Sequence, residues 1–216
     1  MRLRWESAVP VQAAAWLGDV LALPVAAKGD HHEVDFANAV LEIRQPQRPD
    51  RAGGDDRLWL VDESAPGDRA PTARVPHSSG DPPLTVVAVG IATVDMDRFA
   101  AAAGWAIQAI AQDRVLGASS ARVIGHPFVL LEPNTEGRVA ASLARLGEGP
   151  VAIYVTGASG LDLASVGAAM AARRVRMTAT ALGPFGLEFA IAARRAWGPH
   201  VVVCDSAAPA AGTIAP

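Results

Sequence analysis

The segment 128–155 constrains the fold more than any other part of the sequence. It reads FVLLEPNTEGRVAASLARLGEGPVAIYV, and its pattern predicts a strand, a helix, a glycine-rich turn and a second strand. Asn134 or Thr135 is placed to cap the helix, because short polar side chains accept hydrogen bonds from the first free N–H groups. Gly147 and Gly149 predict the end of the helix. The segment is therefore a connector between two larger units.

Each flank of the connector shows the same order of one strand, one helix and three further strands. The apolar runs and turn residues predict this order in 84–133 and again in 150–206, and a less regular version in 1–45. A recurring supersecondary unit cannot bury its apolar face alone, so units of this kind pair. The predicted fold class is α+β, with tandem βαβββ modules whose mostly antiparallel sheets curl into a cup and whose helices lie outside.

The segment 46–83 differs in composition from these modules. It is rich in Pro, Gly, Asp and Arg, and one apolar run, 58–61, predicts a single strand within it. We therefore expect a linker at 46–83 between the N-terminal module (1–45) and the paired modules (84–206), and a flexible tail at 207–216.

Composition narrows the possible partners and surroundings. The net charge is −3 with no basic stripe, so we expect no nucleic acid partner. No apolar run approaches the roughly 18 residues that a membrane span needs. A single cysteine, Cys204, leaves no intramolecular disulfide, which favours a cytoplasmic protein. We interpret Cys204, at the end of a valine run, as a buried small apolar residue.

The order of the modules resembles the vicinal oxygen chelate superfamily, and within it the glyoxalase-like and methylmalonyl-CoA epimerase-like members most closely. LLEPNTEGRVAASLARLGEGPVAIYV looks like the connector between the two modules of the epimerase-like members, and GIATVDMDRF resembles their first strand and helix cap. The N-terminal WLGDVLALPV and FANAVLEIRQP look like the helix and last strand of a further module. The resemblance implies a cup that binds a small organic molecule.

The resemblance also implies a divalent metal held by His, Gln and Glu on the first and last strands of each module. This sequence has apolar residues or proline at most of the corresponding positions, near Val87, Ala88, 150–152 and 201–203. Glu132 is the one carboxylate near an expected ligand position, and a catalytic metal needs about three protein ligands. We therefore predict no cofactor, while a divalent metal bound at other residues stays open.

Two carboxylates are candidates for acid–base chemistry. Glu188 alternates with apolar neighbours and so belongs to the polar face of its strand, and Glu132 ends another strand. With Gln108, Thr178 and Thr180 they form the predicted ligand pocket. Both carboxylates could instead be exposed or ion-paired. The run 154–160 imitates a dinucleotide-binding turn, but no alternating strand–helix pattern surrounds it, so we interpret it as a helix cap.

A second cluster, His31, Glu33 and Asp35, has alternate positions on a predicted strand and would share one face. Such a face could be half of a metal site. No second cluster completes it, so a solvated strand face is the alternative.

Two functions remain open from the sequence, beside a purely structural module that serves only in assembly. The first is a metal-free protein that binds a small organic molecule, with tryptophans available for stacking among the five in the chain. The second is an epimerase, lyase or glyoxalase-type enzyme with a relocated metal or an acid–base pair. The N-terminal module has no obvious mate, so it either pairs with its copy in a second subunit or packs on the edge of the cup. We therefore predict a homodimer.

Overall fold

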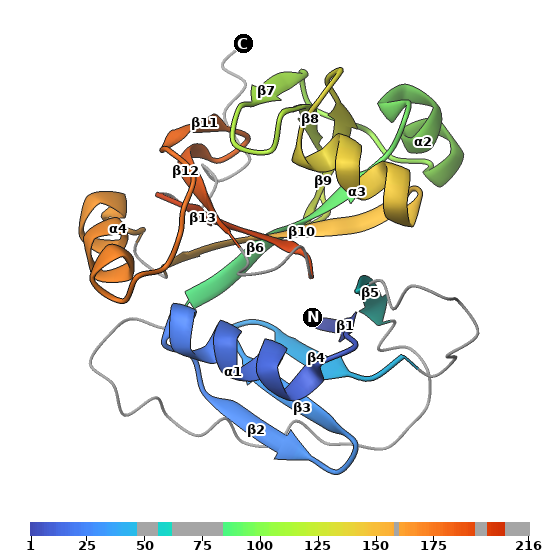
Figure 1. Cartoon of the computed structure of the whole chain (residues 1–216). Coiled ribbons are helices and arrows are strands. Elements are labelled where there is room, and N and C mark those ends of the chain that lie inside the picture. Colours follow the sequence, from blue (N-terminus) through green and yellow to red (C-terminus); the bar gives the residue numbers. More distant parts are fainter. Residues whose placement is uncertain (47–55, 62–83, 158–159, 193–197, 206–216) are drawn as a thin grey trace.

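A computed structural model of the chain describes residues 1–46, 56–61, 84–157, 160–192 and 198–205 (Figure 1). It forms two sheets, one of five strands and one of eight. Most of the predicted linker and the predicted tail lie outside the described residues. Within the described residues, no helix has the length and apolar character needed to cross a membrane.

The three predicted modules share one topology. In each, the first strand pairs in parallel with the last, and the two middle strands continue the sheet outward. The N-terminal module consists of β1 (Arg2–Glu6), α1 (Pro10–Leu21), β2 (Val25–Lys28), β3 (His31–Asp35) and β4 (Val40–Arg44). The middle module consists of β6 (Leu84–Ala92), α2 (Met96–Ala103), β7 (Ala111–Asp113), β8 (Ala118–Arg122) and β9 (Phe128–Pro133). The last module consists of β10 (Gly149–Gly157), α4 (Leu163–Ala172), β11 (Ala181–Gly183), β12 (Gly186–Ile191) and β13 (His200–Cys204).

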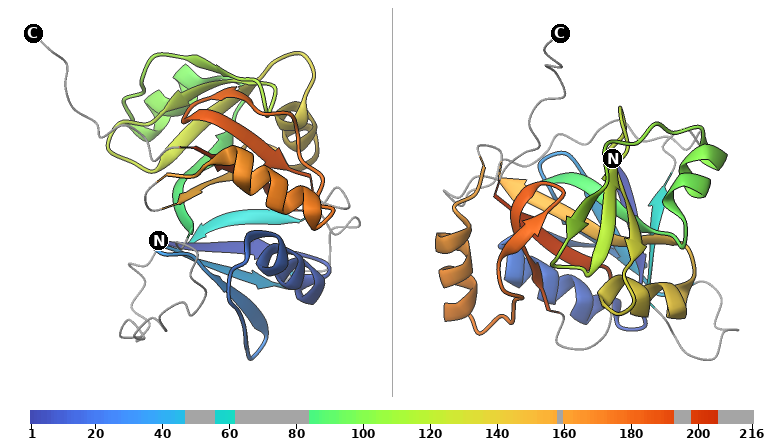
Figure 2. Two further views of the ribbon diagram at one scale, coloured as in Figure 1. Left: turned by 90° about the vertical axis from the view of Figure 1, so that its left-hand side faces the viewer. Right: turned by 90° about the horizontal axis from the view of Figure 1, so that it is seen from above.

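The middle and last modules join into one curled sheet. Their first strands, β6 and β10, pair antiparallel at its centre, and the strand order is β11-β12-β13-β10-β6-β9-β8-β7. The curl brings the two edge strands, β7 and β11, back toward each other (Figure 2). The α+β fold of paired βαβββ modules, predicted from the repeats and from the resemblance, is confirmed.

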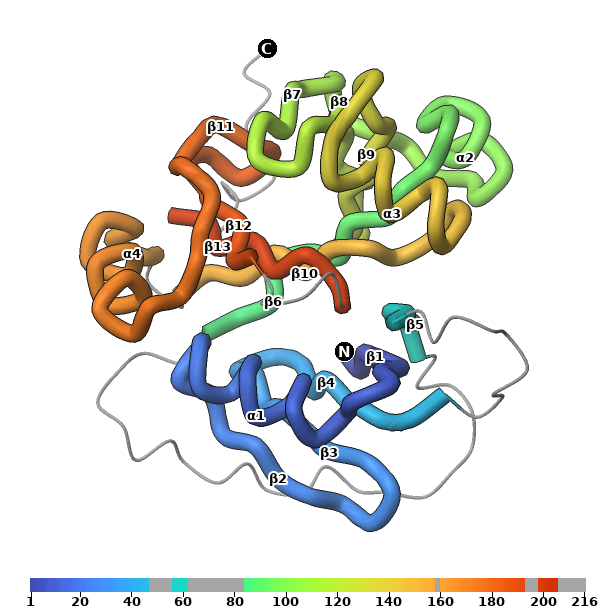
Figure 3. The backbone as a smooth tube through the Cα atoms, viewed as in Figure 1, coloured from blue at the N-terminus to red at the C-terminus, as the bar shows by residue number. Residues whose placement is uncertain are grey.

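The helices lie outside or at the ends of the curled sheet (Figure 3). Helix α2 covers the outer face of β6, β8 and β9, and α4 packs its Leu163, Val166 and Met170 on the outer face of the last module. Asp95 is the N-cap of α2, and its side chain accepts a hydrogen bond from the Arg98 N–H (2.8 Å).

The connector helix α3 (Arg138–Leu146) begins later than expected. Its N-cap is Gly137, so the expected cap at Asn134 or Thr135 is wrong. Backbone hydrogen bonds explain the delay, because the Asn134 N–H donates to the Gly117 carbonyl (3.2 Å) and this holds the preceding turn out of the helix. Val139 of α3 packs with the residues inside the curled sheet, so the helix closes one end of it.

The outermost strands of the two paired modules, β7 and β11, are short. The run 105–111 contributes a single bridge, Ile107 to Val123, and the strand β7 follows it at 111–113. Similarly, 176–182 contributes a bridge at Met177 before the short β11. Both runs lie at the outer edges of their modules, where a strand has hydrogen bonds to a neighbouring strand on one side only.

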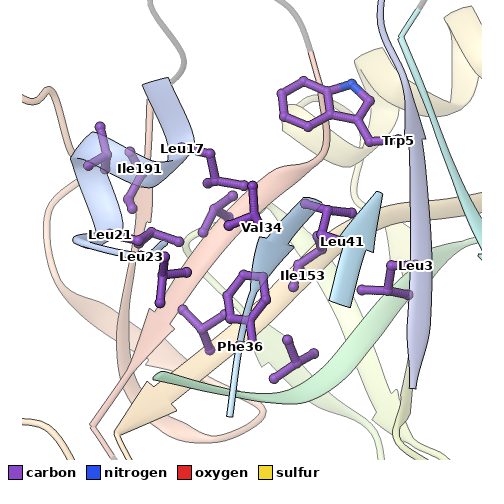
Figure 4. Close-up of a cluster of buried hydrophobic side chains, with 14 of the residues drawn as sticks. Leu3, Trp5, Leu17, Leu21, Leu23, Val34, Phe36, Leu41, Ile153 and Ile191 are labelled. Atoms are coloured by element: carbon purple, nitrogen blue, oxygen red, sulfur yellow. The ribbon is translucent and has the colours of Figure 1, made fainter. Parts of the chain in front are cut away.

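The N-terminal module packs on the outer face of the curled sheet. Leu3, Trp5, Leu17, Ile153 and Ile191 belong to a single buried cluster that spans both sheets (Figure 4). The N-terminal module therefore packs on a face of the curled sheet and not on the edge of the cup, where the second alternative places it.

A fifth strand, β5 (Arg57–Val61), completes the N-terminal sheet. It pairs antiparallel with β1, on the edge that corresponds to the edge of β6 on which β10 pairs. The place of a partner module is thus taken by one strand. The homodimer stays a prediction.

Candidate functional site

The candidate site is the interior of the curled sheet. Alternation along the strands decides which side chains enter it: in β12, Glu188 and Ala190 face inward, while Phe189 and Ile191 face the N-terminal module. Most of the inward side chains are small or apolar, and they form one buried cluster. The few polar side chains among them therefore stand in an environment of low dielectric constant.

Asp113 and Tyr154 form the first part of a polar cluster in this interior. The Tyr154 hydroxyl donates to Oδ2 of Asp113 (2.7 Å), and the Leu116 N–H donates to Oδ1 (2.7 Å). Both side chains have no exposed surface. Asp113 ends β7, and the turn that follows it places the Leu116 N–H against its carboxylate. Tyr154 lies opposite on the central strand β10, so the bond crosses the interior.

Glu188 and Cys204 complete the cluster from the last module. The Cys204 thiol donates to Oε2 of Glu188 (3.8 Å), whereas Oε1 has no hydrogen-bond partner among the described residues. The glutamate packs directly over Gly183, where any Cβ would collide with its carboxyl group. The absence of a side chain at position 183 is therefore what makes room for Glu188.

The two carboxyls perturb each other. Burial, and then the nearby charge of Asp113, raise the pKa of Glu188 to about 9. Burial also raises the pKa of Asp113, although its hydrogen bonds with Leu116 and Tyr154 oppose this. Because the raised pKa of Glu188 lies well above neutral, the two carboxyls together hold one proton at neutral pH. Desolvation raises the pKa of Tyr154 and Cys204 as well, so both stay neutral.

One basic side chain enters the same interior. The Arg122 guanidinium lies over the Phe185 ring, 5.0 Å from its centroid, and that ring contacts Tyr154 at 5.3 Å between centroids. Burial lowers the pKa of Arg122. Within the described part of the chain, no ion pair joins this guanidinium to Asp113 or Glu188.

The cluster lies at a seam where the sheet closes on itself. Between β7 and β11, the described residues form one backbone hydrogen bond, from the Arg114 N–H to the Leu182 carbonyl (3.3 Å). Asp113 and Arg122 approach the seam from the middle module, and Phe185 and Glu188 approach it from the last module. The side chains of the cluster therefore link the two free edges of the sheet.

The residues predicted for the pocket are not all brought together. Glu188 faces the interior. Glu132 faces the outside of β9, where its Oε2 accepts a hydrogen bond from the Met96 N–H (3.0 Å) at the start of α2. The Glu132–Glu188 pair considered from the sequence is thus divided between the two faces of the sheet.

The remaining pocket candidates lie at the margins. Gln108 and Thr180 are exposed. Thr178 is half-buried, and its hydroxyl accepts a hydrogen bond from the Ala190 N–H (2.9 Å), which joins two strands of the last module.

The cluster His31, Glu33 and Asp35 lies on the other sheet. His31 and Glu33 share a face, with 3.5 Å between Nε2 and Oε1, and Glu33 also pairs with Arg2 (3.3 Å) and Lys28 (3.9 Å). These cations occupy the carboxylate oxygens that a metal would need.

The residues of the curled sheet do not fit the metal site that the resemblance implies. Ala88, Ala152 and Val202 belong to the buried apolar cluster, and Glu132 faces outward. Among the described residues, no group of three or more His, Cys, Asp and Glu is arranged to hold a metal ion.

The sequence interpretation did not single out Asp113 or Tyr154. Asp113 lies in QDRVLG, which reads as a turn, because β7 has only three residues. Tyr154 is the only tyrosine of the chain and lies in an otherwise apolar strand, which is the one signal that could have identified it.

The described tryptophans do not lie inside the cup, where a role in stacking on a ligand would place them. Trp5 and Trp16 belong to the core beneath the N-terminal module, and Trp59 lies on β5. Trp105 stacks on Phe128 outside β9, at 5.1 Å between ring centroids. None of these four lies inside the curled sheet, and the fifth, Trp197, lies outside the described residues.

No protein-family model and no curated protein matches this chain. Similar solved structures include a hypothetical protein from Bacillus halodurans, at 19% identity and a TM-score of 0.47, covering 60% of this chain and 99% of that chain. They also include methylmalonyl-CoA epimerase from Streptomyces coelicolor in complex with 2-nitronate-propionyl-CoA, at 20% identity and a TM-score of 0.45, covering 56% of this chain and 94% of that chain. Methylmalonyl-CoA epimerase from Mycobacterium tuberculosis is similar at 20% identity and a TM-score of 0.45, covering 55% of this chain and 85% of that chain.

Proposed function

We propose that the paired modules bind a small organic molecule inside the curled sheet, at Asp113, Tyr154 and Glu188, without a divalent metal. The observation that carries the proposal is Oε1 of Glu188, a buried carboxyl oxygen that no donor of the described residues reaches. Buried polar atoms in folded proteins almost always have a partner, so an orphan atom in a site-like interior indicates a missing one. Perturbed carboxyls also gather at binding and catalytic sites more often than elsewhere.

A thermal-shift screen of small organic compounds tests this proposal. A ligand at a hundred times its dissociation constant stabilises the folded state by about 2.7 kcal/mol, which gives a clear shift in Tm. The shift should shrink in Glu188→Gln and persist in the matched control Glu132→Gln, whose side chain lies on the outer face. The proposal fails if no compound stabilises the protein, or if both variants respond as the wild type does.

The carboxyl pair also favours a second function, proton transfer at a carbon acid, as in an epimerase or lyase. Two carboxyls that share one proton supply a base and an acid side by side, and a pKa near 9 keeps Glu188 protonated as the acid. Solvent deuterium exchange, followed by NMR on small α-substituted acids and their thioesters, tests for it. Exchange that is lost in both Asp113→Asn and Glu188→Gln would support an enzyme, and binding without exchange would leave the binding function alone.

A further inference from the structure

The charges inside the curled sheet are unbalanced. Asp113 and Glu188 face each other across the seam, and Asp205 adds a third carboxyl that acts on Glu188. Its Oδ1 is buried and, like Oε1 of Glu188, has no hydrogen-bond partner among the described residues. Two acidic oxygens of neighbouring segments therefore lack donors among the described residues.

Among the described residues, the groups that face Glu188 offer no cation to compensate. They are Asp113 from β7, Tyr154 from β10, Cys204 from β13 and Asp205 just beyond it, and all of these are acids. Arg122 from β8 is a basic side chain of this interior, and within the described part of the chain it lies on the Phe185 ring and forms no ion pair with the carboxyls. At neutral pH, the shared proton is thus what reduces the negative charge of the pair.

The aromatic groups beside the carboxyls already hold a cation. The Phe185 ring carries the Arg122 guanidinium at 5.0 Å, and Tyr154 lies against the same ring at 5.3 Å. Cations bind aromatic faces within about 6 Å of the ring centroid, most strongly where water is excluded. The interior therefore combines the two kinds of group, carboxylates and aromatic faces, that recognise organic cations.

We propose that the ligand of this interior is an organic cation, whose charged group replaces the proton between Asp113 and Glu188 and whose apolar part packs on Phe185 and Tyr154. This inference rests on the proposed binding function and specifies its ligand class. Binding removes one proton from the carboxyl pair to solvent for each positive charge that enters, so the net charge of the interior stays the same. The Arg122 guanidinium lies on the Phe185 ring in the absence of the ligand and moves off that ring when the ligand binds.

Isothermal titration calorimetry of the full chain with three matched probes tests the ligand class. The probes are benzyltrimethylammonium, benzyl alcohol and benzoate, which share a ring and differ in charge. We expect the cation to bind at least about tenfold more tightly than the alcohol, because Asp113 and Glu188 have no cationic partner among the described residues, and benzoate to bind most weakly. The affinity for the cation should rise by up to about tenfold per pH unit between pH 6 and pH 8, since protons compete with the cation for the carboxyls. Titrations in buffers of different ionisation enthalpy should show one proton released.

Two variants separate this inference from the proposed function. Glu188→Gln keeps the shape of the side chain, so it should abolish the preference for the cation and the pH dependence. Arg122→Met removes the guanidinium that competes for the Phe185 ring and should increase the affinity for the cation several-fold. Equal or tighter binding of benzyl alcohol, or a cation affinity that does not change with pH, overturns the cation and leaves small-molecule binding intact. Failure of all three probes overturns the cation too, and failure of the compound screen as well overturns the binding function. Saturable binding of Mn²⁺ or Zn²⁺ that depends on Glu188 would replace the organic cation with a metal.

Discussion

The pKa of Glu188 predicts that the protein loses stability as the pH rises from 7 to 9. In the unfolded chain this carboxyl has a pKa near 4.5, and in the folded protein burial raises it to about 9. A raised pKa in the folded state means that the folded protein holds a proton which the unfolded chain has already released. Unfolding therefore becomes more favourable by about 1.4 kcal/mol per pH unit until the folded carboxyl itself ionises. Between pH 7 and pH 9, this amounts to about 2 kcal/mol of unfolding free energy.

This pH window isolates Glu188 from two other perturbed groups. His200 has a pKa lowered to about 4, so it is neutral in both states well above pH 7. Glu148 has a pKa lowered to about 2 by its hydrogen bonds with Thr93, Val94 and Arg98, so it is ionised throughout the window. Urea unfolding followed by circular dichroism at pH 7, 8 and 9 measures the change. Glu188→Gln should make the unfolding free energy nearly constant across the window, while Glu132→Gln should keep the wild-type slope. A wild type with constant stability, or a Glu188→Gln variant with an unchanged slope, would refute the assignment of a buried shared proton.

Three further predictions concern single contacts. As the pH falls from 7 to 4.5, the unfolded chain gains a proton at His200, whereas the buried imidazole takes one up only near pH 4. The wild type should therefore lose about 2 kcal/mol of unfolding free energy over this range that the His200→Gln variant keeps, as measured by urea unfolding. Tyr154→Phe removes the buried hydrogen bond to Asp113 and should lower the unfolding free energy by about 1.5–3 kcal/mol; a loss below half of that would mean that the hydroxyl has another role. Gly198→Ala places a methyl group against the Trp5 ring at a residue with φ +83°, so it should destabilise by about 2 kcal/mol or more, and an unchanged Tm would contradict the packing of the two sheets.

The module pattern could be predicted because capping residues, glycines and prolines mark where many of the strands and helices begin and end. Pro24 ends α1, Asp95 begins α2 and Gly147 ends α3, and the apolar runs between such residues have lengths typical of strands. The position of β5 followed from one apolar run within a polar segment. These signals are local, so one sequence suffices to detect them.

The site was harder to predict, because it depends on which face of each strand is inward. In β9, both faces are buried, one by the interior and one by α2, so the apolar run gives no alternation from which to place Glu132. In β12, a single glutamate among apolar residues did mark the inward face. The partner of Glu188 comes from Asp113, 75 positions earlier, and only the curl of the complete sheet brings the two carboxyls together.

The unequal joining of the paired modules has a mechanical consequence. At the centre, β6 and β10 are joined along nearly their whole length, whereas at the seam the described residues contribute one backbone hydrogen bond. Bending the sheet about its central strands would part β7 from β11 without unfolding either module. Amide hydrogens along the seam should therefore exchange with solvent through small local openings, while those of β6 and β10 exchange only when the whole unit unfolds. A molecule that binds in the interior, as proposed above, would then enter and leave on a timescale set by local opening, independently of global stability.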